Sequence, residues 1–506
     1  MSFDIGVVLE GLNLVLQPWT LVMIVLGVLG GIMIGVIPGL TATMAVALLI
    51  PFTFNMPAEV AMALLVVVYV GGISGGCMTA ILIRMPGTPA SVATLLDGFP
   101  MTQQGKGGTA IGNAVVASFF GTVISGIFLV IMAPFLAEFA LKFFYAEYAS
   151  VCIFALCAVV SITGSTLTRG AVTALFGLLA ATFGISEVDG LVRFDLGTEK
   201  LLGGFGLMPV LIGLFAVSQM MQEAAKGITT TKADISALGR VLPTFANIRA
   251  NIVNYLRSGI IGTFIGILPA VGGAPAALIS YSQAKSASKT PEKFGKGIVD
   301  GVIAAETANN ATIGGALIIA LTLGIPGDPV TAILIGGLMI HGLQPGPQLF
   351  MNNPEVVYGI YFSVFFGSLA MMIIMLFAAK PLSRVVEVPK NILLPLLFVV
   401  AATGIYSMNS RVFDVFTMCC FGVLGYVFDR YRYPLAPFIL GYLLGPLVEG
   451  NIRQLVEMQG HAWDMLTRPI SATFLVCAAL FLGFSLYRHR KRGDEPAADN
   501  ALGEGE

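Results

Sequence analysis

The chain has 506 residues, of which 56% are hydrophobic and only 11% carry a charge. Soluble globular proteins carry roughly 25% charged residues, and a water-exposed surface for a chain of this length cannot be made from so few. The 27 Lys and Arg nearly balance the 28 Asp and Glu. These numbers exclude an ordinary soluble enzyme, a nucleic-acid-binding protein and a disordered protein, and they predict an all-α polytopic membrane protein.

Apolar runs near the length of a membrane span follow one another along the chain. They occupy 20–37, 58–73, 109–133, 149–166, 170–185, 201–222, 355–379, 391–408, 412–429 and 469–487. The run 297–313 is polar for a membrane segment, and Pro437, Gly441 and Pro446 interrupt 434–449. Because a span needs about 20 residues, we expect about 10–14 membrane segments, and no membrane β-barrel.

The polar parts of the chain divide it. Residues 1–19 are expected to form an amphipathic interfacial helix, and 488–506 to form a disordered cytoplasmic tail. The longest polar connection, 223–257, is expected to be a cytoplasmic linker. It separates a first transmembrane repeat, 20–222, from a second, 258–487.

Two apolar stretches, 74–100 and 314–342, are each broken at the centre by a Pro-Gly-x-Pro motif. The motifs are 86–89 and 326–329, with Pro86, Pro89, Pro326 and Pro329 as their structural prolines. Proline cannot continue a helix, and the residue before it avoids helical geometry. Each stretch is therefore predicted to be a re-entrant hairpin of two half-helices. The alternative is an ordinary proline kink or a tight loop between complete spans.

A second pair of segments indicates an internal repeat. Residues 31–39 resemble 262–270, 231 residues later, and the two Pro-Gly-x-Pro motifs lie 240 residues apart. Each unit thus has a broken helix followed by a hairpin. Basic residues precede the hairpin in the second unit (Lys285 to Lys296) but follow it in the first (Lys106). By the positive-inside rule, the two repeats are expected to have inverted topology.

Inverted repeats with paired broken helices indicate a secondary transporter, whose binding site forms where the breaks meet. Half-helix N-termini suit a carboxylate, and unwound carbonyls suit Na⁺. The residues predicted to bind substrate are Ser74, Arg84, Gly87, Thr88, Ser91, Gly327, Asp328 and Thr331. Those predicted to bind the cation are Pro38, Gly39, Thr41, Glu306, Asn309, Asn310 and Thr312.

Two of these assignments have explicit alternatives. Arg84 is suited to a bidentate pair with a carboxylate substrate, or equally to a structural pair with Asp97 or an interfacial position. The polar segment 306–312 lies inside an apolar stretch. It is suited to bind Na⁺, with Glu306 as an alternative proton carrier, or to act as an interhelical hydrogen-bond clamp.

Several motifs resemble those of the large membrane permease subunit of the tripartite tricarboxylate transporter family. They are Gly35-Val36-Ile37-Pro38-Gly39-Leu40, Pro86-Gly87-Thr88-Pro89-Ala90-Ser91, Asp97-Gly98-Phe99-Pro100-Met101, Phe294-Gly295-Lys296-Gly297, 306–310, 324–328 and 341–347. The likeness covers about residues 15–450 in one consistent order. Arg84 is a departure, because the family commonly has an uncharged polar residue there.

The resemblance implies a bacterial inner-membrane permease for an organic anion such as citrate. It implies two partners, a periplasmic solute-binding protein and a small membrane subunit. It also implies uptake driven by Na⁺ (or H⁺), without ATP, by an elevator-like mechanism. The sequence shows no catalytic set, no metal site beyond the coupling Na⁺, and no other cofactor. The alternative is an intramembrane enzyme acting on a lipid-linked substrate, which would need convergent catalytic residues at one interface.

Overall fold

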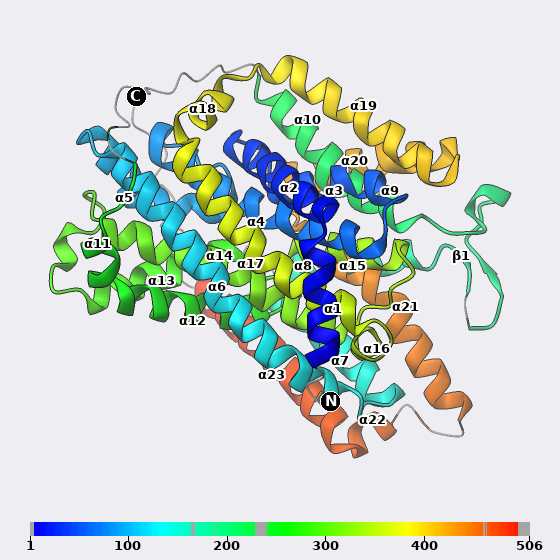
Figure 1. The fold of residues 1–506 in the computed structure, drawn as a ribbon. Helices are drawn as coiled ribbons and strands as arrows, with labels where there is room; N and C mark the ends of the chain where they lie inside the picture. The colour runs from blue at the N-terminus through cyan, green and yellow to red at the C-terminus, as the bar shows by residue number, and fades with distance from the viewer. Residues whose placement is uncertain are drawn as a thin grey trace. The chain divides into compact units, whose positions relative to one another are not determined.

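The computed structural model describes residues 5–162, 167–186, 188–227, 239, 241–458, 461 and 463–493. Helices make up most of these residues (Figure 1). The strands among them are β1 (Gly184–Ile185) and β2 (Val192–Arg193), which pair antiparallel in one small sheet. The prediction of an all-α polytopic membrane protein is confirmed.

The chain divides into two compact units. Unit 1 combines 1–142 with 205–427, and unit 2 combines 143–204 with 428–506. The helices of unit 1 are α1 (Ile5–Leu16), α2 (Pro18–Val36), α3 (Ala42–Thr53), α4 (Ala58–Ile83), η1 (Pro89–Ser91), α5 (Val92–Gln103), α6 (Gly107–Ala140), α9 (Leu207–Ile212), η3 (Gly213–Val217), α10 (Ser218–Ala225), α11 (Phe245–Ala250), α12 (Ile252–Ile267), α13 (Gly273–Ala287), η5 (Pro291–Lys293), α14 (Val299–Leu323), α15 (Pro329–Ile340), α16 (Pro347–Asn352), α17 (Pro354–Phe377), α18 (Ala379–Arg384), η6 (Val385–Glu387), α19 (Lys390–Asn409) and α20 (Val412–Arg430), which ends just inside unit 2. Unit 2 contains β1, β2, α7 (Tyr145–Ile162), α8 (Leu167–Ala181), η2 (Glu199–Leu201), α21 (Leu435–Glu457), α22 (Asp464–Thr467) and α23 (Pro469–Gly493).

Among the described residues, ten helices are long and apolar enough to cross a membrane. This number lies at the lower end of the expected range. Two of the ten differ from the sequence-based expectation. Residues 299–313 of the polar run belong to α14, a 25-residue helix that is buried from Gly301 to Thr322. The stretch 434–449 is one continuous helix, α21, which keeps Pro446 in its interior.

Both predicted helix breaks are present. α2 ends at Val36 and α3 begins at Ala42, with Gly39 between them at φ 89°. In the second repeat α12 ends at Ile267 and α13 begins at Gly273, with Gly272 at φ 71°. The proline in each connection lacks an amide hydrogen, and the glycines adopt the left-handed backbone at little cost.

The helix pairs beside the two breaks pack through equivalent glycines. A side chain at Gly35 of α2 would overlap the carbonyl oxygen of Gly72 in α4. A side chain at Gly266 of α12 would overlap the carbonyl oxygen of Thr312 in α14. Gly35 and Gly266 are 231 residues apart, and Gly72 and Thr312 are 240 residues apart. These are the two offsets read from the sequence. The backbones therefore approach closely in the same register in both halves.

The two Pro-Gly-x-Pro motifs interrupt the helices as predicted, but the arms differ from the expected hairpins. At the first motif, the amide of Gly87 returns to the carbonyl of Gly76 (3.3 Å). α5 then runs beside the last turns of α4, where the hydroxyl of Thr102 donates to the carbonyl of Ile81 (2.7 Å). α4 has 26 residues, so it is a full span rather than a half-helix. The two helices run on in the same sense instead of forming antiparallel arms.

The second motif repeats this arrangement. α14 ends at Leu323, and Gly324 follows it with φ 69°. After α15, the amide of Gly346 returns to the carbonyl of Leu321 near the end of α14 (3.0 Å). We call residues 84–91 the first tip and 324–331 the second tip.

Contacts between the two halves are reciprocal. The amide of Gln104, just after α5, donates to the carbonyl of Lys296, just before α14 (2.7 Å). In turn His341, just after α15, lies 3.2 Å from the hydroxyl of Thr53, just before α4. α13 contacts η1 and α5, and α3 contacts α15. An inverted repeat would give this pattern; the inversion and the division into 20–222 and 258–487 stay predictions.

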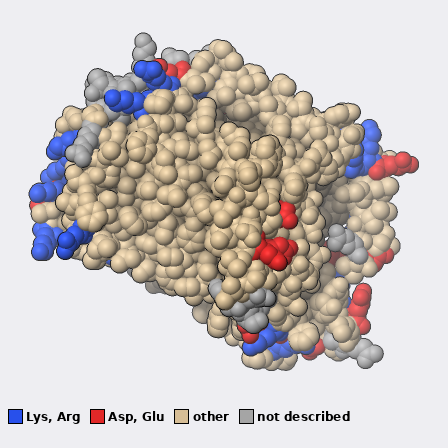
Figure 2. All heavy atoms as spheres, viewed as in Figure 1, with Lys and Arg blue, Asp and Glu red and all other residues tan. Residues whose placement is uncertain are grey.

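Basic side chains gather at one end of unit 1, over α11, α13 and α18 (Figure 2). Arg249 belongs to α11, Lys285 to α13, and Arg384 to α18. The broad surface beside them in this view carries few charges. By the positive-inside rule this end is predicted to be cytoplasmic.

The predicted terminal and linker segments are described in part. α1 covers 5–16 of the predicted interfacial helix and packs Gly11 against Tyr358 of α17; residues 1–4 lie outside the described residues. In the predicted linker, α11 and the start of α12 are described, whereas 228–238 and 240 are not. α23 continues to Gly493, into the predicted tail, and 494–506 lie outside the described residues.

Unit 2, taken by itself, is held by ion pairs at helix ends. Arg193, at the end of β2, pairs with Glu449 of α21 (2.8 Å). Arg453, one turn later in α21, pairs with the same carboxylate (2.7 Å) and with Asp189 of the β1–β2 turn. These pairs fasten the small hairpin to α21.

Candidate functional site

Glu306 of α14 lies at the centre of a buried hydrogen-bond network in unit 1. Its side chain is fully buried. The hydroxyl of Thr94 in α5 donates to one carboxylate oxygen. The hydroxyl of Ser118 in α6 donates to the other (3.3 Å). Glu306 takes part in none of the ion pairs found among the described residues, so neutral donors alone surround this carboxylate.

Asn310 extends the network to α4. Its side-chain nitrogen lies 3.1 Å from the carbonyl of Glu306 and 3.4 Å from the carboxylate. Its side-chain oxygen accepts a 2.7 Å hydrogen bond from Ser74. Both Ser74 and Asn310 are fully buried. One connected set of polar groups therefore joins α4, α5 and α6 to α14; we call it the polar centre.

Asn309 is buried beside the polar centre, near the Glu306 carboxylate. Neither its side-chain oxygen nor its nitrogen makes a hydrogen bond of normal geometry, although the residue is fully buried. The oxygen faces Gly273 at the start of α13, where a Cβ would come within van der Waals overlap. The Cβ of Ala90, in the first tip, would lie 3.0 Å from the same Cβ position on Gly273. The unpaired amide thus lies where the second break meets the first tip.

The second tip is fixed by a capping box. Asp328 accepts from the backbone amide of Thr331 (2.8 Å), while the hydroxyl of Thr331 accepts from the amide of Asp328 (2.9 Å). Tyr69 of α4 donates to the other carboxylate oxygen. This arrangement satisfies the first turn of α15 and ties the tip to α4.

The first tip is held by steric fit and one side-chain pair. The hydroxyls of Thr88 and Ser91 lie 3.1 Å apart. A Cβ on Gly87 would come 2.7 Å from the Cα of Gly76. In the second tip, a Cβ on Gly327 would come 2.6 Å from the Cα of Ala316. Both tip glycines are required by close backbone approach rather than by an unusual φ.

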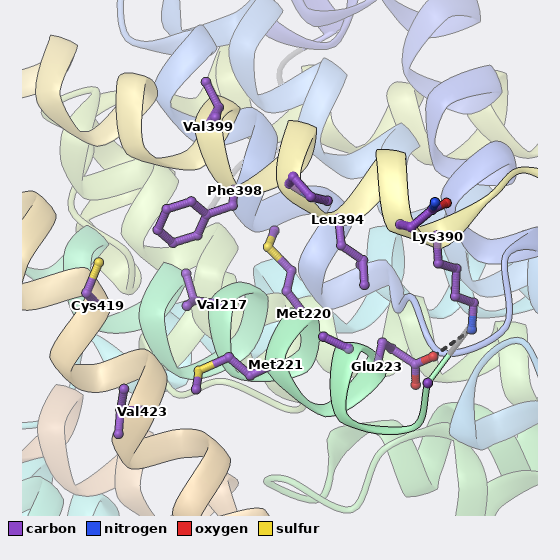
Figure 3. A pocket seen from close by; sticks show the side chains of 14 residues that line it. Val217, Met220, Met221, Glu223, Lys390, Leu394, Phe398, Val399, Cys419 and Val423 are labelled. Atoms are coloured by element: carbon purple, nitrogen blue, oxygen red, sulfur yellow. Dashed lines mark hydrogen bonds and ion pairs between the residues drawn. The ribbon is translucent and has the colours of Figure 1, made fainter. Parts of the chain in front are cut away.

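The first break, 37–41, is occupied by side chains from α10. Gln219 donates to the carbonyl of Gly39 (2.7 Å) and accepts from the hydroxyl of Thr41 (2.8 Å). Glu223, one turn later, packs against Gly39 and leaves no room for a side chain there. Figure 3 shows Glu223 directed toward Lys390 of α19, with which it forms a 2.6 Å ion pair. The carbonyl of Gly39 and the hydroxyl of Thr41 therefore already have partners.

Arg84 lies apart from the polar centre. It is the left-handed residue that follows α4 (φ 59°), is exposed, and lies over the ring of Phe99 at 5.8 Å. The structural alternative of an Arg84–Asp97 pair is not what the structure shows. Asp97 instead accepts from three backbone amides of the loop before α14, including those of Gly295 (2.9 Å) and Gly297 (2.8 Å).

The predicted site residues thus form three groups. Ser74, Glu306 and Asn310 belong to the polar centre, with Asn309 beside it. The tip residues flank it, and Pro86, Pro89, Pro326 and Pro329 lie at the tips. Pro38, Gly39, Thr41 and Arg84 lie elsewhere, and the last three have the partners given above. The hydroxyl of Thr312 is turned to the carbonyl of Asn309 in its own helix (2.6 Å).

Several residues of the site were not assigned from the sequence. They are Tyr69, Thr94, Ser118, Gln219, Glu223 and Gly273. Ser118 had a readable signal, because Ser118 and Thr122 repeat one turn apart inside the apolar helix α6. Gln219 and Glu223 had none, since they precede a polar connection and look like ordinary helix-end residues.

The chemistry of the polar centre is that of a hard-oxygen site. Carboxylate, amide and hydroxyl oxygens are ligands for small cations, and ionisable groups inside a membrane are costly unless they have a function. Of the described residues, no group of three or more His, Cys, Asp and Glu is placed to hold a metal ion. The arrangement suits reversible binding of a monovalent cation or a proton.

Comparison with known proteins identifies the relatives of this chain. The sequence pattern of the tripartite tricarboxylate transporter TctA family matches residues 21–440. An uncharacterized 52.8 kDa protein of Agrobacterium vitis, from the TAR-I ttuC′ 3′ region, is 33% identical over 466 residues. That alignment covers 92% of this chain and 93% of the relative.

A second Agrobacterium vitis protein, uncharacterized and from the TAR-II ttuC′ 3′ region, is 37% identical over 226 residues. Its match covers 44% of this chain and 93% of the relative. No solved structure matches the chain.

Proposed function

Because the chain belongs to the tripartite tricarboxylate transporter TctA family, we propose that it is the permease of an ion-coupled uptake system for a di- or tricarboxylate such as citrate. Proteins of this family are membrane subunits of transporters and not enzymes, so the alternative of an intramembrane enzyme is set aside. The family works with a binding protein and a small membrane subunit. Our proposal places the chain in the bacterial inner membrane, with the binding protein on the periplasmic side.

The proposed substrate site lies between the two tips. Backbone amides around η1, with the hydroxyls of Thr88 and Ser91, suit the carboxylates of the substrate. Ser74, Gly87, Gly327, Asp328 and Thr331 complete the proposed set. Arg84 is kept in the proposal as the residue that meets the substrate at the C-terminal end of α4, because it is the only exposed cation of the first tip.

The proposed coupling-ion site is built on Glu306, Asn309 and Asn310. The single observation that carries this proposal is the unpaired amide of Asn309, fully buried beside a carboxylate that has no ion-pair partner. Leaving an amide unsatisfied in a membrane interior costs several kcal/mol (about 1–3 by protein mutational data). A bound cation at the amide oxygen would remove part of that cost.

Na⁺ is our first choice for the coupling ion, with H⁺ on Glu306 as the second. Three uncharged donors around Glu306 support either assignment. The proposed assignments of Gly39, Thr41 and Thr312 to the cation are weakened, because Gln219 and the helix backbone already use their polar groups. Pro38 stays in the proposal with them as part of the first break. The two tips pack in equivalent ways against the preceding helices, α4 and α14. This pairing supports an elevator-like movement of the site.

The proposal is tested by transport of labelled citrate in vesicles that contain this chain, the small subunit and the binding protein. We expect accumulation with an inward Na⁺ gradient and none without it. Accumulation driven by a proton gradient alone would replace Na⁺ by H⁺. Transport that requires ATP would overturn the proposal.

A further inference from the structure

A large apolar pocket lies in unit 1 between α10, α19 and α20, away from the polar centre. Its volume is about 690 Å³. Figure 3 shows its lining: Met220 and Met221 come from α10, Leu394 and Phe398 from α19, and Val423 from α20. All three helices belong to segments long and apolar enough to span a membrane. Phe398 is 37% exposed and Val423 50% exposed, so the pocket opens on the surface of the helices.

One end of the pocket is charged. Glu223 is only 4% exposed and pairs with both Lys226 and Lys390 at 2.6 Å. Two lysines facing one carboxylate leave a net positive charge at this end. The Lys226 side chain is 67% exposed, so its ammonium retains donors for another acceptor.

The pocket therefore complements the two chemical parts of a lipid, its acyl chain and its charged headgroup. An apolar chain-binding cavity is continuous with a cationic end at the end of two spanning helices, α10 and α19. Basic pockets between transmembrane helices bind anionic phospholipid headgroups, and a phosphate accepts charge-assisted hydrogen bonds from lysine. A zwitterionic headgroup would bring a second cation beside the two lysines.

We propose that this pocket binds an anionic phospholipid, with one acyl chain against Leu394 and Phe398 and the phosphate at Lys226 and Lys390. The site is independent of the proposed transport substrate. It is nevertheless placed to act on the first break, because Glu223 packs against Gly39.

The test uses tryptophan fluorescence in the full chain, reconstituted in phosphatidylcholine vesicles. The chain has two tryptophans, so Trp19→Phe and Trp463→Phe give a silent background. Val399→Trp places a reporter in the pocket, and Leu396→Trp places a matched reporter on the same helix, exposed and outside the pocket lining. Brominated phosphatidylglycerol and brominated phosphatidylcholine are the quenchers.

We expect half-quenching of the Val399→Trp reporter at a lower mole fraction of brominated phosphatidylglycerol than of brominated phosphatidylcholine. The expected difference is about fivefold, which corresponds to ~1 kcal/mol for one net basic charge. The Leu396→Trp reporter should show no preference, and Lys226→Gln should remove the preference at Val399→Trp.

Three results would overturn the proposal. The first is equal quenching of the Val399→Trp reporter by both lipids. The second is loss of all quenching there when the small membrane subunit is produced together with the chain, which would assign the pocket to a protein helix. A phosphatidylglycerol preference that appears equally at Leu396→Trp would indicate ordinary surface lipid and also counts against the site.

Discussion

The hydroxyl of Ser74 in α4 donates a 2.7 Å hydrogen bond to the side-chain oxygen of Asn310 in α14. These residues belong to the two helices that lead into the tips. The nitrogen of the same amide lies 3.1 Å from the carbonyl of Glu306. One asparagine therefore connects the spanning helix of the first half with the buried carboxylate of the second, and a change at the polar centre is expected to affect both tips.

Replacing Glu306 by glutamine tests whether the charge of the polar centre couples transport to the ion gradient. The substitution keeps the shape: the hydroxyl that faces the new amide nitrogen can turn to accept from it, while the other hydroxyl still donates to the remaining oxygen. We expect gradient-driven accumulation to fall by at least about tenfold, or ~1.4 kcal/mol, while the protein still inserts and exchanges substrate. Uptake and exchange are measured in the same vesicles. Glu10→Gln, an exposed glutamate of α1 outside the polar centre, is the control. Accumulation by Glu306→Gln equal to the parent chain would contradict a coupling role.

The tip glycines offer a steric test. Gly87→Val and Gly327→Val each place atoms where a Cβ would already lie 2.7 Å or less from a neighbouring backbone carbon. We expect both variants to insert but to lose transport, because the tip can no longer rest against the preceding helix. Gly30→Val is the matched control, since a Cβ at Gly30 meets nothing within 4 Å. Transport by both tip variants at the rate of the parent chain would show that the tips are ordinary loops without a role in transport.

Asp97 is expected to hold the loop before α14 in place. Its carboxylate accepts from the amides of Gly295, Gly297 and Ile298 (2.8–3.0 Å), and Tyr281 donates to its second oxygen (2.8 Å). Asp97→Ala leaves several donors unpaired, so we expect it to lower the free energy of unfolding by about 2–3 kcal/mol, against ~1 kcal/mol for Tyr281→Phe.

The readouts for the Asp97 variants are thermal unfolding and tryptic cleavage after Lys296, which lies in the same loop. Cleavage should be fastest in Asp97→Ala and intermediate in Tyr281→Phe. An unchanged cleavage rate in Asp97→Ala would show that the loop is held by other contacts, such as the Gln104–Lys296 hydrogen bond.

Arg84 combines an unfavourable backbone with an exposed charge. It holds the left-handed conformation at the end of α4 (φ 59°), where Gly324 ends α14 (φ 69°). Since that conformation costs a non-glycine residue roughly 1–2 kcal/mol, we expect Arg84→Gly to raise thermal stability. If Arg84 meets the substrate, the same variant should raise the apparent KM for the organic anion. A more stable protein with unchanged KM would make Arg84 a structural residue only.

The sequence by itself determined the places where the helices break. The breaks at Pro38 and Pro269 and the two tips follow from proline and glycine, whose backbone effects are local and therefore readable from residue type. The same holds for the polar segment that contains Glu306 and Asn310, because polar groups in an apolar run are conspicuous without any knowledge of their neighbours.

Only the tertiary structure decided what those places contact. The donors to Glu306, Thr94 and Ser118, are 212 and 188 residues away in the chain. The first break is filled by Gln219, 180 residues away. α4 and α5 follow one another in the same sense, where the motif predicted antiparallel arms. Such contacts depend on how distant helices pack, which hydropathy and residue spacing do not specify, because in the membrane every apolar face is equally able to meet lipid or another helix.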